Sequence, residues 1–181
     1  MRPTGDLMEE HRVIERMLNV VSKAADMLES GEPVEQAVFA DATDFFKNFA
    51  DKCHHGKEEA LMFKKLIDRG VSGEVGPISV LTREHQDGRA HIRKIAELSA
   101  GEFDGRNRKG LILQIRGYVS LMNLHIPKED NVLFPMANGI LTPEDQEELM
   151  IGFEKHEQEV MGPGAHERYH LMIEEWEKKY L

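Results

Sequence analysis

The sequence has one cysteine, no long apolar run and no block of basic residues. A lone Cys53 excludes an internal disulfide framework and is typical of a reducing compartment, so we expect a cytoplasmic protein. No apolar stretch approaches the roughly 18 residues that span a membrane, and the first residues lack the apolar segment of a secretory signal. The formal net charge of −10 argues against nucleic acid and anionic membranes as partners. These absences leave a small, acidic, globular chain of 181 residues.

Strand-like alternation is also nearly absent, and apolar residues instead recur at helical spacing. The pattern predicts long helices over about 8–30, 33–67, 78–100 and 107–137, with Pro33 early in the second helix. Glycine-rich and proline-containing segments separate them. Thr142 reads as the N-cap of a further helix, and the segment "GPGAHERYH" separates that helix from a final one. We therefore expect an all-α protein.

The predicted helices suggest one compact arrangement. Four long helices joined by short connections most simply form an antiparallel up-down four-helix bundle, here residues 1–140. The remaining residues, 141–181, would be a C-terminal helical extension packed on the bundle. Dimerisation through the last helix, with Trp176 and Tyr180, is a hypothesis that would give a homodimer.

Two ten-residue segments of the chain share one pattern. "HHGKEEALMF" (54–63) and "HIPKEDNVLF" (125–134) both read His-x-x-Lys-Glu-acid-x-φ-φ-Phe, where φ is Leu, Met or Val. Residues four apart lie on the same helical face, so His54 with Glu58, and His125 with Glu129, each present an imidazole and a carboxylate together. A carboxylate can bridge two cations, and the duplicated unit would supply two such bridges.

The remaining long helices each add a histidine at a similar depth. His11 lies about as far from the turn near Ser30 as His54 lies from Pro33, and His85 pairs with His125 in the same way. Four histidines and two glutamates form a mixed nitrogen and oxygen donor set, typical of iron, manganese or zinc rather than calcium or magnesium. The sequence therefore predicts a metal centre inside the bundle.

These segments resemble a known family. "MEEHRVIERML", "HHGKEEALMF", "LTREHQDGRAHI" and "HIPKEDNVLFPMA" are similar, in this order, to the motifs of the hemerythrin-like, HHE cation-binding proteins. The resemblance covers roughly residues 4–138. It implies a four-helix bundle with a carboxylate-bridged, non-haem centre of two iron ions. The ligands that it carries over are His11, His54, Glu58, His85, His125 and Glu129.

Two departures from the oxygen-carrying members affect the ligand set. Those proteins have a second histidine four residues after the one in the third helix, where this chain has Arg89. The loss leaves an open position on one iron, or recruits another ligand. They also place the last acid where Asp130 stands here, although Glu129 is equally available. A competing register, His55 with Glu59, lies one residue along from His54 and Glu58.

The family resemblance implies several functions. The chain would bind or react with O₂, NO or peroxide, in oxygen or redox sensing or in stress protection. An alternative is iron storage and delivery for the repair of iron–sulfur clusters, and a weaker one is a structural zinc or manganese site. An open metal position favours reactive chemistry over reversible O₂ carriage. No reaction follows from the sequence, so we expect a ligand-binding protein more than an enzyme.

The other chemically active residues have plainer interpretations. Cys53 continues an apolar stripe and reads as an inert core thiol, and His91 reads as a surface residue. Pro127 should kink or break the fourth helix. His156, His166 and His170 lie on apolar faces and read as packing residues. In the alternative interpretation, the segment from His166 to His170 crosses the open end of the bundle and touches the metal site.

Overall fold

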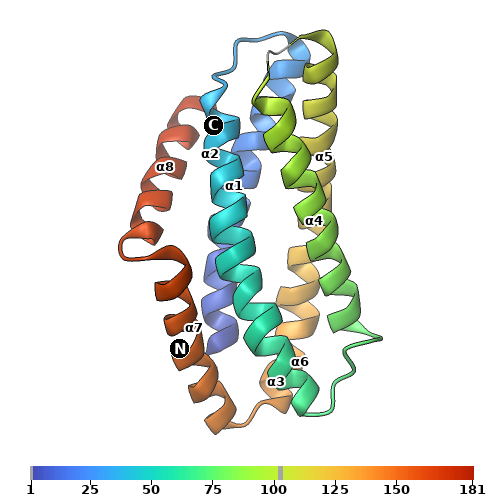
Figure 1. Cartoon of the computed structure of the whole chain (residues 1–181), viewed down its shortest axis with the longest axis vertical. Helices are drawn as coiled ribbons and strands as arrows, with labels where there is room; N and C mark the ends of the chain where they lie inside the picture. Colours follow the sequence, from blue (N-terminus) through green and yellow to red (C-terminus); the bar gives the residue numbers. More distant parts are fainter. Residues whose placement is uncertain (1, 102–103) are drawn as a thin grey trace.

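A computed structural model describes residues 2–101 and 104–181 (Figure 1). Every regular element in these two ranges is a helix, which confirms the all-α prediction. The elements, with π-helices written η, are α1 (Pro3–Ser30), α2 (Ala37–Phe45), η1 (Phe46–His55), η2 (Glu58–Met62), α3 (Phe63–Asp68), α4 (Pro77–Ser99), α5 (Gly105–Lys128), η3 (Glu129–Leu133), α6 (Phe134–Ile140), α7 (Pro143–Met161) and α8 (Ala165–Tyr180).

The start of the second helical segment was predicted wrongly. Pro33 lies in the connection between α1 and α2, and α2 begins at Ala37. A hydrogen bond to the last helix holds this connection in place: the Glu35 amide donates to the Tyr180 hydroxyl at 3.0 Å. The turn after α1 has the expected glycine, with Gly31 at a φ of 85°, a left-handed conformation that other residues rarely adopt.

The two repeated segments coincide with π-helical turns. The second long segment runs as α2, η1, η2 and α3, and the fourth as α5, η3 and α6. A π-helix bonds residue i to i+5, so its turn is wider than that of an α-helix, and π turns are frequent at functional sites. Pro127 lies inside α5, just before η3, and the helix continues past it rather than breaking. Its missing N–H removes one bond of the α-helical pattern at this point.

The packed side chains form two apolar clusters along the molecule. The larger joins α1, α2, η1, α4, α5 and α8, and includes Phe45, Phe49, Ile115 and Tyr118. The smaller includes Leu7, Met62, Leu81 and Leu133. On α1 the predicted ligand His11 falls between Leu7 of the smaller cluster and Val13 of the larger one. His85 similarly falls between Leu81 and Ile92 on α4, so the polar residues form a layer between two apolar regions.

Helices α7 and α8 lie along one side of the other helices (Figure 1). The predicted N-cap is confirmed: the Thr142 hydroxyl accepts from the Asp145 amide at 3.2 Å, and the Asp145 carboxylate accepts from the Thr142 amide at 3.0 Å. The predicted separator "GPGAHERYH" was too long, because α8 already begins at Ala165. A short turn with two glycines at positive φ, Gly162 and Gly164, joins α7 to α8, and the chain continues in the same general direction (Figure 1).

The last helix packs inward. Trp176 donates from Nε1 to Asp41 at 2.8 Å, and Trp176 and Tyr180 belong to the larger apolar cluster. These two side chains are therefore buried within one chain and offer no free surface to a second copy. A homodimer formed through them stays a hypothesis. Among the described residues, no helix combines the length and the apolar character needed to cross a membrane.

Candidate metal centre

Seven side chains that could bind metal meet in the polar layer between the two apolar clusters. They come from six different elements and are all at most 3% exposed. The seven are His11 (α1), His54 and His55 (η1), Glu58 (η2), His85 (α4), His125 (α5) and Glu129 (η3). All six residues predicted as principal ligands are therefore brought together, and His55 joins them.

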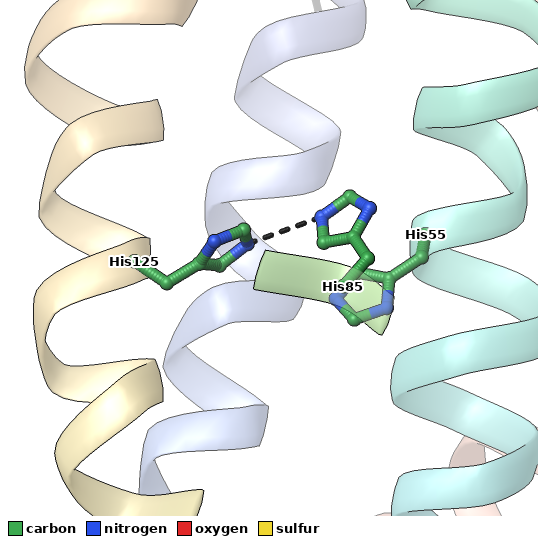
Figure 2. Close-up of side chains that lie close together, drawn as sticks. All are labelled: His55, His85 and His125. Atoms are coloured by element: carbon green, nitrogen blue, oxygen red, sulfur yellow. Dashed lines mark hydrogen bonds between the residues drawn. The ribbon is translucent and has the colours of Figure 1, made fainter. Parts of the chain in front are cut away.

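The seven side chains form two adjacent groups. His11, His54, Glu58 and Glu129 make one group, and the ligand atoms they offer lie within 4.8 Å of one another. His55, His85 and His125 make a second group by the same measure, called the three-histidine group below. Figure 2 shows its three rings converging from separate helices, with Nε2 of His85 and Nε2 of His125 3.2 Å apart.

Each glutamate reaches both groups with a different oxygen. Glu129 places Oε2 3.1 Å from His11 Nε2 and Oε1 3.2 Å from His125 Nε2. Glu58 places Oε1 3.7 Å from His54 Nε2 and Oε2 3.5 Å from His85 Nε2. A carboxylate with one oxygen on each side is suited to bridge two metal ions, one ion in each group.

A carboxylate outside the groups lies against Nδ1 of every one of the five histidines. The pairs are His11 with Asp130 at 2.6 Å, His54 with Glu10 at 2.9 Å, His55 with Asp51 at 3.4 Å, His85 with Glu59 at 2.7 Å and His125 with Glu84 at 2.9 Å. When Nδ1–H donates to a carboxylate, the ring is oriented and Nε2 keeps its lone pair for a metal. Such carboxylate–histidine pairs are the usual surroundings of metal-binding histidines.

Basic side chains neutralise these outer carboxylates in turn. Arg89 donates to Asp51 at 2.7 Å and to Glu59 at 3.0 Å. The other pairs are Lys57 with Glu10 at 2.8 Å, Lys128 with Glu84, and Arg12 with Asp130. The positive charge that the outer carboxylates need thus comes from the protein, and the two inner glutamates are left without such a partner.

The inner atoms are buried without hydrogen-bond partners. In the described part of the chain these atoms include both oxygens of Glu58, both oxygens of Glu129, and Nε2 of His11 and of His55. Leaving a buried carboxylate without a donor costs free energy, so such atoms indicate a ligand or ion that fills the space. The donor set therefore fits a pair of metal ions.

The electrostatics of the inner residues support the same interpretation. Burial, together with the nearby charge of Glu129, raises the pKa of Glu58 well above its ordinary value. Burial opposes ionisation of Glu129 too, but the nearby His125 and His11 hold its pKa well below the ordinary value. Of the two inner carboxyl groups, Glu58 therefore favours the protonated form and Glu129 the ionised form. A metal cation would take over the role of that proton, because carboxylate ligands bind in ionised form.

Burial sets the protonation of the histidines as well. It lowers the pKa of His54 to about 4, and burial together with His85 lowers that of His55 well below the ordinary value. For His11 the effect of burial is outweighed by the hydrogen bond to Asp130 and by the nearby carboxylate of Glu129, which raise its pKa to about 9. His54 and His55 are neutral near pH 7, the form in which imidazole binds a metal.

His55 was predicted as part of a competing register, and the structure shows that the two registers do not compete. His54 and His55 both point inward from η1, into different groups. Adjacent side chains on an α-helix are about 100° apart, and the wider turn of a π-helix brings them closer in angle. Arg89, which stands where the oxygen carriers have a histidine, lies outside the groups and binds Asp51 and Glu59.

The other less certain candidates lie outside the two groups. Glu59 and Asp130 accept from histidines, as described above. His166 lies 3.2 Å from Glu157 and its ring packs 4.9 Å from that of Phe49. His170 is half-buried on α8 and belongs to none of the metal-binding groups found among the described residues.

A third cluster contains Glu10, Cys53, Glu157 and His166. It already holds a cation, because Nζ of Lys57 lies 2.8 Å from Glu10, 3.1 Å from Glu157 and 3.1 Å from Asp6. Burial raises the pKa of the Cys53 thiol to about 12, so it stays protonated. This cluster is better explained as an ion-pair network, and Cys53 as the inert core thiol that was expected.

Sequence reasoning missed the outer carboxylates Glu10, Asp51 and Glu84. A signal for them was present. Glu10 directly precedes His11 and Glu84 directly precedes His85, so the pair Glu-His occurs once in α1 and once in α4. Asp51 stands four residues before His55, a spacing that places both on one helical face. What could not be foreseen is that Glu10 and Glu84 serve the histidine of the neighbouring helix.

Comparison with known proteins agrees with this site. The family model described as the hemerythrin HHE cation-binding domain matches residues 2–137. The chain is also 26% identical over 159 residues to the uncharacterized proteins Rv1995 of Mycobacterium tuberculosis and Mb2018 of Mycobacterium bovis, covering 87% of this chain. It spans 62% of the length of these relatives. No solved structure gave a significant match. Since the family model covers most of the sequence, including all seven side chains of the centre, the chain belongs to the hemerythrin HHE cation-binding domain family.

Proposed function

We propose that the chain holds two iron ions in an antiparallel up-down bundle of four helical segments, as a non-haem centre that binds or reacts with O₂, NO or peroxide. The observation that carries this proposal is the pair of inner glutamates, each with one oxygen toward each histidine group. A carboxylate that offers one oxygen to each histidine group suits a pair of ions better than a single ion. The mixed imidazole and carboxylate donors favour iron, and admit zinc or manganese.

The residues assign separate roles to the two halves of the centre. One ion would be held by His11 and His54, the other by His55, His85 and His125, with Glu58 and Glu129 shared. When bound, a pair of iron ions supplies the electrons needed to bind or reduce a diatomic molecule or peroxide. The protein keeps bulk water away from the pair, because all of these side chains are buried.

The position of His55 bears on which chemistry to expect. The sequence favours reactive chemistry over reversible binding only because Arg89 stands where a histidine is missing. His55 lies with His85 and His125 and supplies a third imidazole to this group, so the missing histidine no longer favours either chemistry. The assay must therefore distinguish a stable, reversible complex from consumption of the oxidant.

The experiment is to load the chain with Fe²⁺ without oxygen and record its visible spectrum before and after adding O₂, NO or hydrogen peroxide. We expect a new visible absorption band after the addition. If the protein is an O₂ carrier or sensor, removing O₂ should make this band disappear. Loss of peroxide over many equivalents would indicate protective chemistry. Glu58→Ala should abolish the response, and Glu74→Ala, in the exposed loop before α4, should preserve it. Iron-loaded protein that responds to none of the three would contradict the proposal.

A further inference from the structure

A pocket opens on the side of the molecule that carries the three-histidine group. It has a volume of about 360 Å³ and lies between α2 and η1 on one side and α4 on the other. Pockets that bind small molecules are commonly about 300–1,000 Å³, so this one is large enough for a modest organic ligand. His55 and Arg89 form part of its lining. The pocket therefore reaches from the surface to the wall of the metal centre.

The inner part of the pocket is apolar. Phe46, Ile92 and Tyr118 line it and are at most 8% exposed, and Ala96 adds a small side chain. Gly88 also lies in the lining, and the absence of a side chain there leaves room beside the ring of Tyr118, since a Cβ would come within 3.4 Å of that ring. A hydrocarbon chain placed here would be removed from water, which is favourable in proportion to the area buried.

The outer part is positively charged, in contrast to the net charge of −10. Lys47 and Arg93 line the pocket from opposite walls and are exposed. Neither forms an ion pair with the residues that the structure describes, whereas Arg89 is already held by Asp51 and Glu59. Two free cations at the mouth of an apolar pocket match a ligand with one anionic end and one apolar end.

We propose that this pocket binds a small amphipathic carboxylate, with its anionic end at Lys47 and Arg93 and its hydrocarbon chain against Phe46, Ile92 and Tyr118. The binding does not require metal. If the proposed iron centre is present, the far end of the ligand lies against His55, beside the three-histidine group. That consequence rests on the proposed function and would make the carboxylate a substrate or effector of the centre.

The test is a calorimetric titration of the full chain with octanoate, with the metal content of the same sample measured in parallel. Octanoate should bind, and octanol, which has the same chain without the charge, should bind more weakly. The double variant Lys47→Gln/Arg93→Gln should lose about fivefold in affinity, as expected for two exposed charge contacts. Ala96→Phe should lose about tenfold or more by filling the pocket.

The matched control is Lys23→Gln/Arg83→Gln, which removes the same charge from exposed helix positions outside the pocket and should bind octanoate as the unmodified chain does. Octanoate that fails to bind, that binds equally to the Lys47→Gln/Arg93→Gln variant, or that binds no better than octanol overturns the proposal. Octanoate binding in protein that takes up no iron would refute the iron centre and leave the pocket in place. Iron uptake without octanoate binding would refute the pocket proposal and leave the iron centre in place.

Discussion

At the scale of single residues, His55 breaks the symmetry of the centre. In the alignment of the two repeated segments His55 corresponds to Ile126, while His54 corresponds to His125 and Glu58 to Glu129. The other ligands form two equivalent sets, so His55 alone makes one group of three histidines beside a group with two. From the sequence, His54 and His55 are alternative candidates for one ligand position, because two adjacent residues of an α-helix do not both lie on one narrow face.

His55→Ala should therefore reduce bound iron from about two ions to about one per chain, since it removes a donor from the three-histidine group only. His91→Ala is the matched control: His91 lies outside the centre, with Nδ1 2.9 Å from the side chain of Gln114, and its loss should leave the metal content unchanged. Metal analysis of both variants after the same loading gives the answer. Equal metal content in the two variants would show that His55 is not a ligand.

Lys57 offers a second test at this scale, because its counterpart in the other repeat is Lys128. Lys57 is 1% exposed and neutralises the buried Glu10, whereas the Lys128 side chain is 43% exposed. Removing one member of a buried ion pair costs about 3–5 kcal/mol, and an exposed pair is worth about 0–1 kcal/mol. Lys57→Met should thus lower the free energy of unfolding far more than Lys128→Met.

Urea denaturation of the two variants under the same metal conditions measures this difference. Adding Glu10→Gln to Lys57→Met should recover part of the loss, because it removes the buried charge left without a partner. If the Lys57→Met and Lys128→Met variants have equal free energies of unfolding, the buried Lys57 network does not stabilise the folded chain as expected.

At the scale of elements, the repeated pattern has a single structural explanation. In each copy the histidine points to the centre and the glutamate reaches both groups, and the following acid holds the histidine of a neighbouring helical segment: Glu59 holds His85 and Asp130 holds His11. The lysine binds the acid that precedes a histidine, Lys57 with Glu10 and Lys128 with Glu84. The final phenylalanines stack on histidines, Phe63 on His85 and Phe134 on His11. Each helical segment therefore supplies both a ligand and the support of its neighbour's ligand.

The sequence predicted the helical elements well and their internal irregularities not at all. Apolar spacing identified the helices because one face of each is buried, and Thr142 marked the start of α7 because its hydroxyl satisfies a free amide. The π turns of η1, η2 and η3 leave no mark on that spacing. They contain His54 and His55 (η1), Glu58 (η2) and Glu129 (η3), and the packing of these residues into one layer is a tertiary effect.

The N-terminus of α7 gives a prediction with a defined pH window. The hydrogen bond from Arg69, partly opposed by burial, lowers the pKa of Asp145 from an ordinary 3.8 to about 2. A lowered pKa means that the folded state favours the ionised form, so this stabilisation is present above about pH 4 and is lost as the pH falls toward about 2. Unfolding free energies measured across that window should fall more steeply for the unmodified chain than for Asp145→Asn. Parallel curves would rule out this contribution.

At the scale of the whole molecule, a polar layer divides the apolar interior. Above and below it the two apolar clusters are closely packed, and within it the inner carboxylate oxygens have no partner in the described structure. The sequence located this layer correctly, since one histidine per helix at matched depth requires only the helical rise. It could not reveal the ring of outer carboxylates, because those contacts join residues of different helices.

Because the polar layer lies in the middle of the interior, metal bound there should stabilise the folded chain. A ligand that binds only the folded chain adds stability that grows with its concentration, about 2.7 kcal/mol when the free metal is a hundred times the dissociation constant. The iron-loaded chain should therefore melt at a higher temperature than the chelator-treated chain, as scanning calorimetry would show. Identical melting temperatures would imply that the inner carboxylates do not bind metal.

The proposed site holds a pair of metal ions shared by two carboxylates, and the binding stoichiometry tests it most directly. Purified chain would be titrated with Fe²⁺ in the absence of oxygen, and the tightly bound iron counted after removal of the excess. We predict two ions per chain, falling sharply in Glu58→Ala and in Glu129→Ala because each removes a shared ligand. One ion per chain, or none, would contradict a site built for two ions.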